Sequence, residues 1–346
     1  MFQKSYRLLI AIVQLLAGIS LVLFIVFLIG KVSANYEKQN LPNGWQLIRP
    51  PQDIMALTTI GDNVWAGGKE GLFCFDRKSA EQKQLPFQAA SIRYVKALLY
   101  DKQGVLWIAY DGGISRFKND IWDNISVRAG SFPAAPRALM EDQKGIIWIG
   151  TDKGLYLYQD TKITNVDVPK DLGMMELDVL YEDRNGIIWF GCSSPVRGGL
   201  FSFDGSSWKS YSQKDGLIHA SVNAITEDSQ GALWIGTGFA NRGGACCLIK
   251  GVWKCWTKTD GLAGEKVRSV YQTHEGALLF GSEYDGLSLY SGGNWKVFND
   301  REGLAGKEVK VIAQDKDGVL WLGTNNGLNR IEKNIFALSV KDKSPL

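Results

Sequence analysis

Basic side chains recur at one position of a short repeated motif, where they are well placed to bind a charged ligand. Lys96 in KALLYD and Arg137 in RALMED each precede a small residue that begins an apolar, strand-like stretch. Alignment of all such stretches gives Met55, Lys96, Arg137, Asp178, Asn223, Arg268 and Lys310. If these side chains meet around one opening, the four cations could hold a carboxylate, a sulfate or an acidic sugar through charge-assisted hydrogen bonds. The alternative is a merely polar rim, in which Asp178 and neighbouring acids neutralise the cations.

Catalysis and metal binding find little support in the sequence. The two histidines, His219 and His274, lie in different segments, outside any H-E-x-x-H motif and away from a plausible cysteine pair. Two facing carboxyl groups are typical of a glycosidase, and three Glu-Asp pairs invite that comparison: Glu141-Asp142, Glu182-Asp183 and Glu227-Asp228. Their recurrence at one repeat position instead predicts turns in which Asp accepts local backbone hydrogen bonds, on the face opposite the ligand. We therefore expect no catalytic residue, metal or cofactor.

The cysteines permit one geometric hypothesis. Their number, five, is odd, so at least one thiol is free unless it pairs with another chain. In GACCLIKGVWKCW, a hairpin turning about Lys250-Gly251 would place Cys246 opposite Cys255, where a disulfide is plausible outside the cytoplasm. Cys74 and Cys192 are interpreted as small residues packed within sheets.

All of these residues lie within a repeated unit whose core reads G-x-hydrophobic-W-hydrophobic-G. The seven copies centre on Trp65, Trp107, Trp148, Trp189, Trp234, Leu279 and Trp321. Successive copies are 42, 41, 41, 45, 45 and 42 residues apart, which is the period of four-stranded propeller blades. Because the tryptophans repeat at one blade position, we expect them to fill the space between neighbouring sheets.

The predicted fold is all-β: a seven-bladed β-propeller preceded by one N-terminal transmembrane helix. Each unit contains four strand-like pieces separated by Gly, Asp and Asn, and no long helical periodicity follows residue 34. The expected division is a cytoplasmic tip and helix (1–34), a linker (35–44), the propeller (45–340) and a tail (341–346). Either Trp45 to Ile48 or Ile335 to Val340 could complete the last blade, and we favour the N-terminal segment.

The segment from Leu8 to Gly30 carries no charge over 23 residues, long enough to span a hydrocarbon layer of ~30 Å. An uncleaved anchor is favoured over a signal peptide cleaved near Val32-Ser33-Ala34, because a signal's apolar region is usually shorter. Lys4 and Arg7 precede the span, which favours a cytoplasmic amino terminus and a propeller outside the cytoplasm. The net charge of +3 is too small to indicate a nucleic-acid partner.

Two long segments between the second and third strands of neighbouring repeats each end in Arg-Gly-Gly. They are SSPVRGG at Ser193 to Gly199, with Arg197, and GFANRGG ending at Gly244, with Arg242. Surface loops tolerate insertion, so sequence drift is one interpretation; a shared binding rim that includes both arginines is the other.

The repeat resembles the two-component regulator propeller repeat of bacterial membrane sensors. The matching segments are EDQKGIIWIGTDKGLYLY, EDRNGIIWFG, EDSQGALWIGT and DKDGVLWLGTNNGLNRI, accompanied by WKSYSQKDGL, WKCWTKTDGL and WKVFNDREGL. The resemblance covers Trp45 to about Val340. Members often add a second propeller, a further β-domain and a cytoplasmic kinase; this sequence ends after one propeller, so we expect no phosphotransfer of its own.

Together these patterns predict a noncatalytic binding module at the bacterial cytoplasmic membrane, with its propeller on the periplasmic or extracellular side. Its partner would be a small anionic or oligosaccharide ligand at the channel mouth, or an envelope or membrane protein. Docking of a protein predicts an aromatic patch, for which Phe239 and Tyr284 are candidates. The alternative from another class is a propeller enzyme, a lyase or glycan hydrolase acting at the same mouth.

Overall fold

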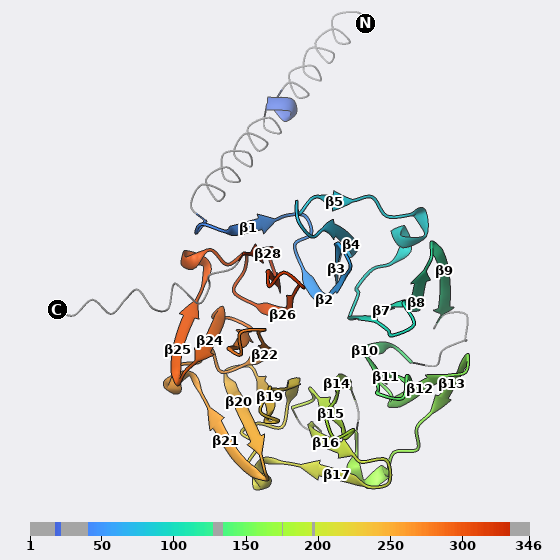
Figure 1. Cartoon of the computed structure of the whole chain (residues 1–346), viewed down its shortest axis with the longest axis vertical. Coiled ribbons are helices and arrows are strands. Elements are labelled where there is room, and N and C mark those ends of the chain that lie inside the picture. The colour runs from blue at the N-terminus through green and yellow to red at the C-terminus, as the bar shows by residue number, and fades with distance from the viewer. Residues whose placement is uncertain (1–17, 22–40, 127–133, 175, 196–197, 333–346) are drawn as a thin grey trace, which may run out of the picture.

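Seven four-stranded antiparallel sheets are arranged radially around a central axis (Figure 1). The computed structural model describes residues 18–21, 41–126, 134–174, 176–195 and 198–332. The predicted seven-bladed, all-β propeller is therefore confirmed.

Within each of blades 1 to 6 the chain runs from the inner strand to the outer strand. Blades 1 and 2 comprise β2 (Ile54–Ile60), β3 (Asn63–Gly68), β4 (Gly71–Asp76), β5 (Gln82–Lys83), β6 (Ala97–Tyr100), β7 (Leu106–Tyr110), β8 (Gly113–Lys118) and β9 (Ile121–Ser126). Blades 3 and 4 comprise β10 (Pro136–Glu141), β11 (Ile147–Thr151), β12 (Leu155–Gln159), β13 (Lys162–Asn165), β14 (Leu177–Glu182), β15 (Ile188–Cys192), β16 (Gly199–Phe203) and β17 (Trp208–Tyr211). Blades 5 and 6 comprise β18 (Val222–Glu227), β19 (Leu233–Phe239), β20 (Arg242–Ile249), β21 (Val252–Trp256), β22 (Val267–Gln272), β23 (Leu278–Ser282), β24 (Leu287–Ser291) and β25 (Asn294–Phe298). Short 3-10 helices lie in five connections: η1 (Phe87–Ser91), η2 (Lys170–Leu172), η3 (Gln213–Asp215), η4 (Lys258–Asp260) and η5 (Asp300–Glu302).

Blade 7 is built from both ends of the propeller. It contains β26 (Val309–Gln314), β27 (Leu320–Thr324) and β28 (Gly327–Ile331), and its outer strand is β1 (Trp45–Ile48). β1 pairs antiparallel with β28, and the two strands lie side by side in Figure 1. The N-terminal segment thus closes the ring as predicted; Ile335 to Val340, the other candidate, lies outside the described residues.

The hydrophobic core is divided among the spaces between blades. Seven buried clusters each combine side chains of two neighbouring sheets; Trp148 of blade 3, for example, packs with Phe190 and Phe201 of blade 4. Trp321 packs in the same way against Ile54 and Phe75 of blade 1. The predicted role of the second-strand tryptophans as core residues is confirmed.

The Glu-Asp pairs are structural, as their repetition predicts. Asp142 Oδ1 accepts the backbone N–H groups of Lys144 and Ile146, and Oδ2 accepts Trp148 Nε1 at 2.9 Å. The same Asp-to-Trp bond, 2.7 to 3.2 Å long, is made by Asp101, Asp183, Asp228 and Asp315. In blade 6, Thr273 and Leu279 replace both partners together, so neither an orphaned indole N–H nor an orphaned carboxylate results.

In blades 3 to 7 the residue before this Asp, or before Thr273 in blade 6, binds the preceding blade. Its side-chain oxygen accepts a backbone N–H from the inner turn of the preceding blade, an interaction that we call the latch. The five latches, 2.7 to 2.9 Å long, are Glu141 to Lys102, Glu182 to Gln143, Glu227 to Arg184, Gln272 to Ser229 and Gln314 to His274.

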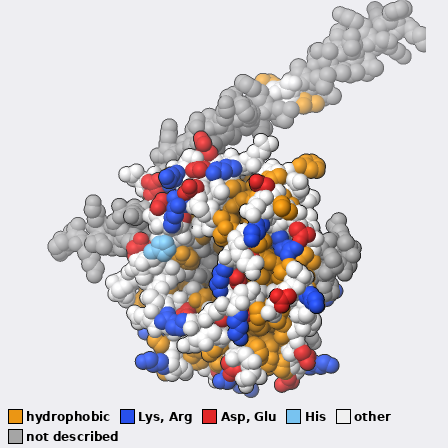
Figure 2. Space-filling view, turned by 45° about the vertical axis from the view of Figure 1, so that its right-hand side comes forward, with side chains coloured by type: hydrophobic (Ala, Val, Ile, Leu, Met, Phe, Trp, Pro, Cys, Tyr) orange, Lys and Arg blue, Asp and Glu red, His pale blue; other side chains and the backbone are white. Residues whose placement is uncertain are grey.

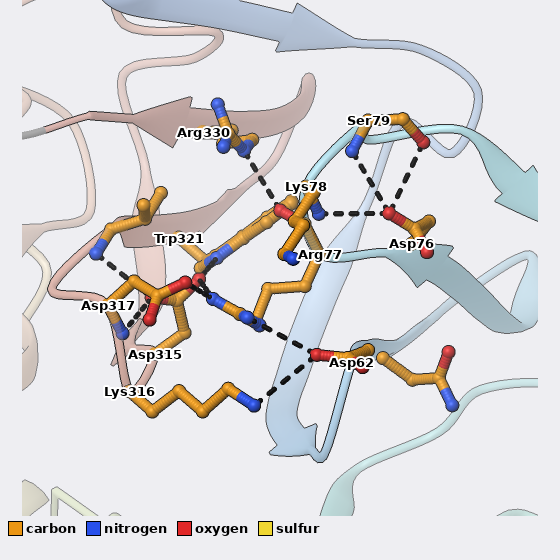
Figure 3. A network of polar contacts seen from close by, with 12 residues as sticks. Asp62, Asp76, Arg77, Lys78, Ser79, Asp315, Lys316, Asp317, Trp321 and Arg330 are labelled. Carbon is orange, nitrogen blue, oxygen red and sulfur yellow. Dashed lines mark hydrogen bonds and ion pairs between the residues drawn. The ribbon is translucent and has the colours of Figure 1, made fainter.

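The closing seam between blades 7 and 1 is held by charge instead (Figure 3). Arg77 follows β4, and its guanidinium is almost fully buried. It pairs with Asp62 of blade 1 at 3.3 Å and, on blade 7, with Asp315 at 3.6 Å and with Asp317. Arg330 Nε donates to the Arg77 carbonyl at 3.2 Å, which adds a second link across the seam.

The helix predicted from Leu8 to Gly30 lies mainly outside the described residues. Residues 18–21 are described there, and they are helical. Nowhere in the described ranges is a helix both long enough and apolar enough to cross a membrane.

Candidate functional site

The starts of the inner strands surround a cavity of ≈ 210 Å³ on the channel axis, which we call the mouth. Its lining consists of Met55, Lys96, Arg137, Asp178, Ser193, Asn223, Arg268 and Lys310. All seven residues predicted from the alignment are therefore brought together, and Ser193 is added.

A β-bulge directs most of these side chains into the mouth. In blade 3 the register shifts between Pro136 and Ala138, so that Arg137 has no partner on β11. Equivalent shifts leave Met55, Asp178, Asn223, Arg268 and Lys310 unpaired in their own blades. A bulge re-aims the extra residue, so one repeated irregularity of the inner strands builds the ring.

Most of the positive charge of the ring is neutralised. Arg137 Nε lies 2.5 Å from Asp178 Oδ1, and the hydroxyl of Ser193 donates to the other oxygen of Asp178. Lys310 lies 2.6 Å from Asp53 and 3.4 Å from Glu308. Basic and acidic side chains are likewise interspersed on the face visible in Figure 2. The mouth is therefore a mixed polar site rather than a uniformly positive ring.

Two of the neutralising acids, Asp53 and Glu308, come from the second position before the ring residue of their own blade. Asp53 of blade 1 pairs with Lys310 of blade 7, and Glu308 of blade 7 pairs with Arg268 of blade 6 at 3.2 Å, an ion pair without hydrogen-bond geometry. Each acid thus faces the cation of the preceding blade. This set was not predicted, although the same alignment moved by two residues shows it: Asp53, Tyr94, Ala135, Glu176, Ser221, Lys266 and Glu308.

Lys96 is the exception to this pairing. The following blade presents Ala135 at the position that would supply its acid. Among the described residues, no ion pair joins the Lys96 ammonium to a carboxylate. The four ring cations and the three carboxylates paired with them therefore leave a formal charge of +1, located at blade 2.

Arg137 and Asn223 are both oriented by their neighbours. Burial alone would lower the pKa of Arg137. The hydrogen bond to Asp178 and the charges of nearby acids together outweigh burial, so the pKa of Arg137 is raised. The amide nitrogen of Asn223 donates to the carbonyls of Gly238 and Val267 at 3.0 and 3.1 Å. Its carboxamide is thereby fixed, and the oxygen is left as an acceptor.

Comparison with known proteins supports the architecture deduced above. The sequence profile described as "Two component regulator propeller" matches residues 216–239 and 303–326, two passages that include Trp234 and Trp321. No curated protein matches the chain in sequence.

Solved structures with the same fold include sensor domains and enzymes. The extracellular domain of a hybrid two-component system from B. thetaiotaomicron has a TM-score of 0.75 at 18% identity, over 87% of this chain and 42% of that one. A second extracellular domain, from a one-component system of B. thetaiotaomicron, has a TM-score of 0.67 at 18% identity, over 84% and 40%. An inactive virginiamycin B lyase from Staphylococcus aureus has a TM-score of 0.65 at 15% identity, over 83% and 98%. The chain thus spans less than half of the two sensor chains, and at these identities the likeness concerns the fold alone.

One of the two Arg-Gly-Gly segments is not a loop. β19 and β20 continue through GFANRGG and pair as far as Phe239 and Arg242, which leaves a two-residue turn. The extension is possible because a Cβ on Gly243 would lie 2.4 Å from the Gly238 Cα, so only glycine allows the two backbones to approach. The expected long loop is therefore corrected to a strand extension; Arg242 does not line the mouth, and Arg197 lies outside the described residues.

The repeat of blade 5 also contains the disulfide considered above. Cys246 on β20 faces Cys255 on β21 with a Cα separation of 4.0 Å, and the two sulfurs are bonded. Cys74, Cys192 and Cys247 are buried and are not disulfide-bonded. Burial raises the pKa of the Cys74 and Cys247 thiols to about 11, so both are poor nucleophiles at neutral pH.

The two histidines lie on opposite faces of the propeller, one before an inner strand and the other after an inner strand. His219 precedes β18, and its Nδ1 accepts the backbone N–H of Ser221 at 3.0 Å. Burial, and secondly Arg242, lowers the pKa of His219. His274 lies in the turn after β22, on the face away from the mouth, and no metal-binding cluster of His, Cys, Asp or Glu occurs in the described part of the chain.

Proposed function

We propose that this propeller is a noncatalytic binding module that receives a small ligand at the mouth. The observation that carries the proposal is the convergence of seven ring residues, one from each blade, on a single cavity. Binding sites combine a concave surface with a few oriented polar groups, and the bulged strands, Asp178 and the fixed amide of Asn223 supply such groups.

The proposal places the module outside the cytoplasm, anchored by the N-terminal apolar segment. The disulfide between Cys246 and Cys255 supports this location, because such bonds persist in oxidising compartments. The similar folds of two extracellular sensor domains support it as well.

Protein docking is the second version of the same proposal. Phe239 and Tyr284 are about half exposed, on the tips of neighbouring blades. The Lys266 ammonium lies 5.7 Å from the Phe239 ring centroid and pairs with Glu283, so the aromatic ring is held in place. Exposed and ordered aromatics are typical anchors of protein interfaces.

An enzymatic role is the alternative from another class, since similar folds include virginiamycin B lyase. Neither histidine lines the mouth, and the carboxylates of Asp178 and Asp53 are each bound to a cation. The geometry therefore favours binding over acid–base chemistry.

The decisive experiment compares what copurifies with the full chain, extracted from membranes in mild detergent, for two tryptophan variants. Met55→Trp fills the mouth, whereas Val252→Trp places the same side chain on an exposed outer strand as the control. We expect a small molecule to copurify with the wild type and the control and to be lost from Met55→Trp. A protein partner retained by all three would contradict the ligand-receptor version, and a small molecule unaffected by Met55→Trp would contradict a site at the mouth.

A further inference from the structure

One side of the mouth lacks the acid that the rest of the ring possesses. Asp53 neutralises Lys310, and Glu308 neutralises Arg268, each from two positions before its own blade's ring residue. The equivalent residue opposite Lys96 is Ala135. Residues 127–133, which precede it and lie outside the described part of the chain, contain no Asp or Glu in their sequence.

The neighbouring cation on this side is bound through only one of its nitrogens. Asp178 accepts Arg137 Nε at 2.5 Å and is itself held by Ser193. Neither terminal nitrogen of Arg137 is hydrogen-bonded to a described residue, although the carboxylates of Glu176 and Asp152 lie near enough to raise the pKa of Arg137. A guanidinium fixed at Nε presents these nitrogens as a planar pair, the geometry that suits a carboxylate.

We propose that Lys96 and Arg137 form an anion subsite that binds the carboxylate of a small organic monoacid. This inference rests on the proposed function, which places a ligand at the mouth. A carboxylate supplies the charge that Ala135 does not, and with it the formal charge of the ring falls from +1 to zero. The cavity of ≈ 210 Å³ limits the ligand to a few heavy atoms beyond the carboxylate.

The rest of the lining fits a small polar acid. Met55 flanks Lys96 on blade 1 and presents an apolar surface, while Asn223 offers its amide oxygen to a hydroxyl or amine of the ligand. A dianion such as sulfate is less well matched, because one of its charges would remain uncompensated after Lys96 is neutralised.

Methionine methyl NMR can test the subsite on the full chain in detergent. Met55 lines the mouth, and buried Met140 in the core between blades 3 and 4 is an internal reference. The probe is propionate, with propionamide as its neutral isostere, at constant ionic strength. We expect propionate to shift the Met55 methyl resonance saturably and to leave Met140 unchanged, whereas propionamide has no effect.

Two variants remove the subsite in different ways. Lys96→Gln deletes the ammonium, and Ala135→Glu supplies the missing acid while keeping Lys96; each should weaken propionate binding about 10-fold. Position 135 should tolerate glutamate, because Glu176 and Glu308 occupy the same repeat position. Gln230→Glu adds the same charge to an exposed turn on the other face and should bind as the wild type does.

Three results would overturn the inference: equal shifts by propionamide, wild-type affinity in both Lys96→Gln and Ala135→Glu, or tighter binding of sulfate than of propionate. A copurified ligand that is lost from Met55→Trp but insensitive to Lys96→Gln and Ala135→Glu would also overturn it, while the proposed function would stand. Absence of any mouth-dependent ligand would count against the proposed function itself.

Discussion

The closing seam and the latch junctions join neighbouring blades through different polar interactions. From blade 2 to blade 7, each successive pair is joined by one latch from a Glu or Gln side chain to a backbone N–H. At the position of the latch acceptor, blade 1 carries Thr59 and blade 2 carries Tyr100 in place of Glu or Gln, so the described residues form no latch at the seam or between blades 1 and 2. Arg77 and its three carboxylates take the place of the latch at the seam. A repeat can encode contacts between successive units, but ring closure requires residues that the repeat does not specify.

The largest expected effect is a loss of unfolding free energy at a latch junction. It tests whether the hydrophobic core, rather than the latch, stabilises the contact between two blades. Trp148→Ala should lower the free energy of unfolding by about 3–5 kcal/mol, because it opens a cavity between blades 3 and 4 and orphans Asp142 Oδ2. Urea denaturation of the full chain measures this change, and Trp148→Phe, which keeps most of the volume, is the control. A loss below ~1 kcal/mol for Trp148→Ala would mean that the tryptophans are not the main source of stability between neighbouring blades.

A smaller effect should distinguish the seam from a latch. Arg77→Met leaves buried Asp315 without its cation and should cost about 2–3 kcal/mol. Glu182→Gln is the matched change at a latch junction and should cost less than ~0.5 kcal/mol, because Gln272 and Gln314 make the same bond in the native chain. Equal losses in urea midpoints would erase the distinction between the two kinds of junction.

The smallest effect is the response of the seam to acid. The Arg77 guanidinium lowers the pKa of Asp62 and of Asp317 below the ordinary value of 3.8, so their contribution is present above that pH and is lost as the pH falls through the lowered values. Burial instead raises the pKa of Glu182 above 4.5. Protonation of this carboxylate in acid therefore removes the free-energy cost of burying its charge. We expect the wild-type urea midpoint to fall more steeply below pH 3.8 than that of Arg77→Met. Parallel profiles would show that the seam carboxylates do not stabilise closure.

The sequence predicted the features that recur and missed those that depend on neighbours. The ring residues could be predicted because they share one position, and the bulge that aims them repeats with the blade. The neutralising partners could not be anticipated in the same way, since Asp53 meets Lys310 only when the two ends of the ring come together. The extended hairpin at Phe239 was missed because its glycines suggest a loop, whereas here they permit two backbones to pack closely.

Strand β1 has a consequence for how the protein is made. Trp45 pairs with Ile331, 286 residues later in the chain, so the first strand synthesised must wait for the last before it finds its partner. At about 5–20 residues per second, translation keeps β1 unpaired for tens of seconds. During that interval the unpaired edge of β1 is available to other chains. Biogenesis of this propeller therefore depends on protection of its first strand until the ring is complete.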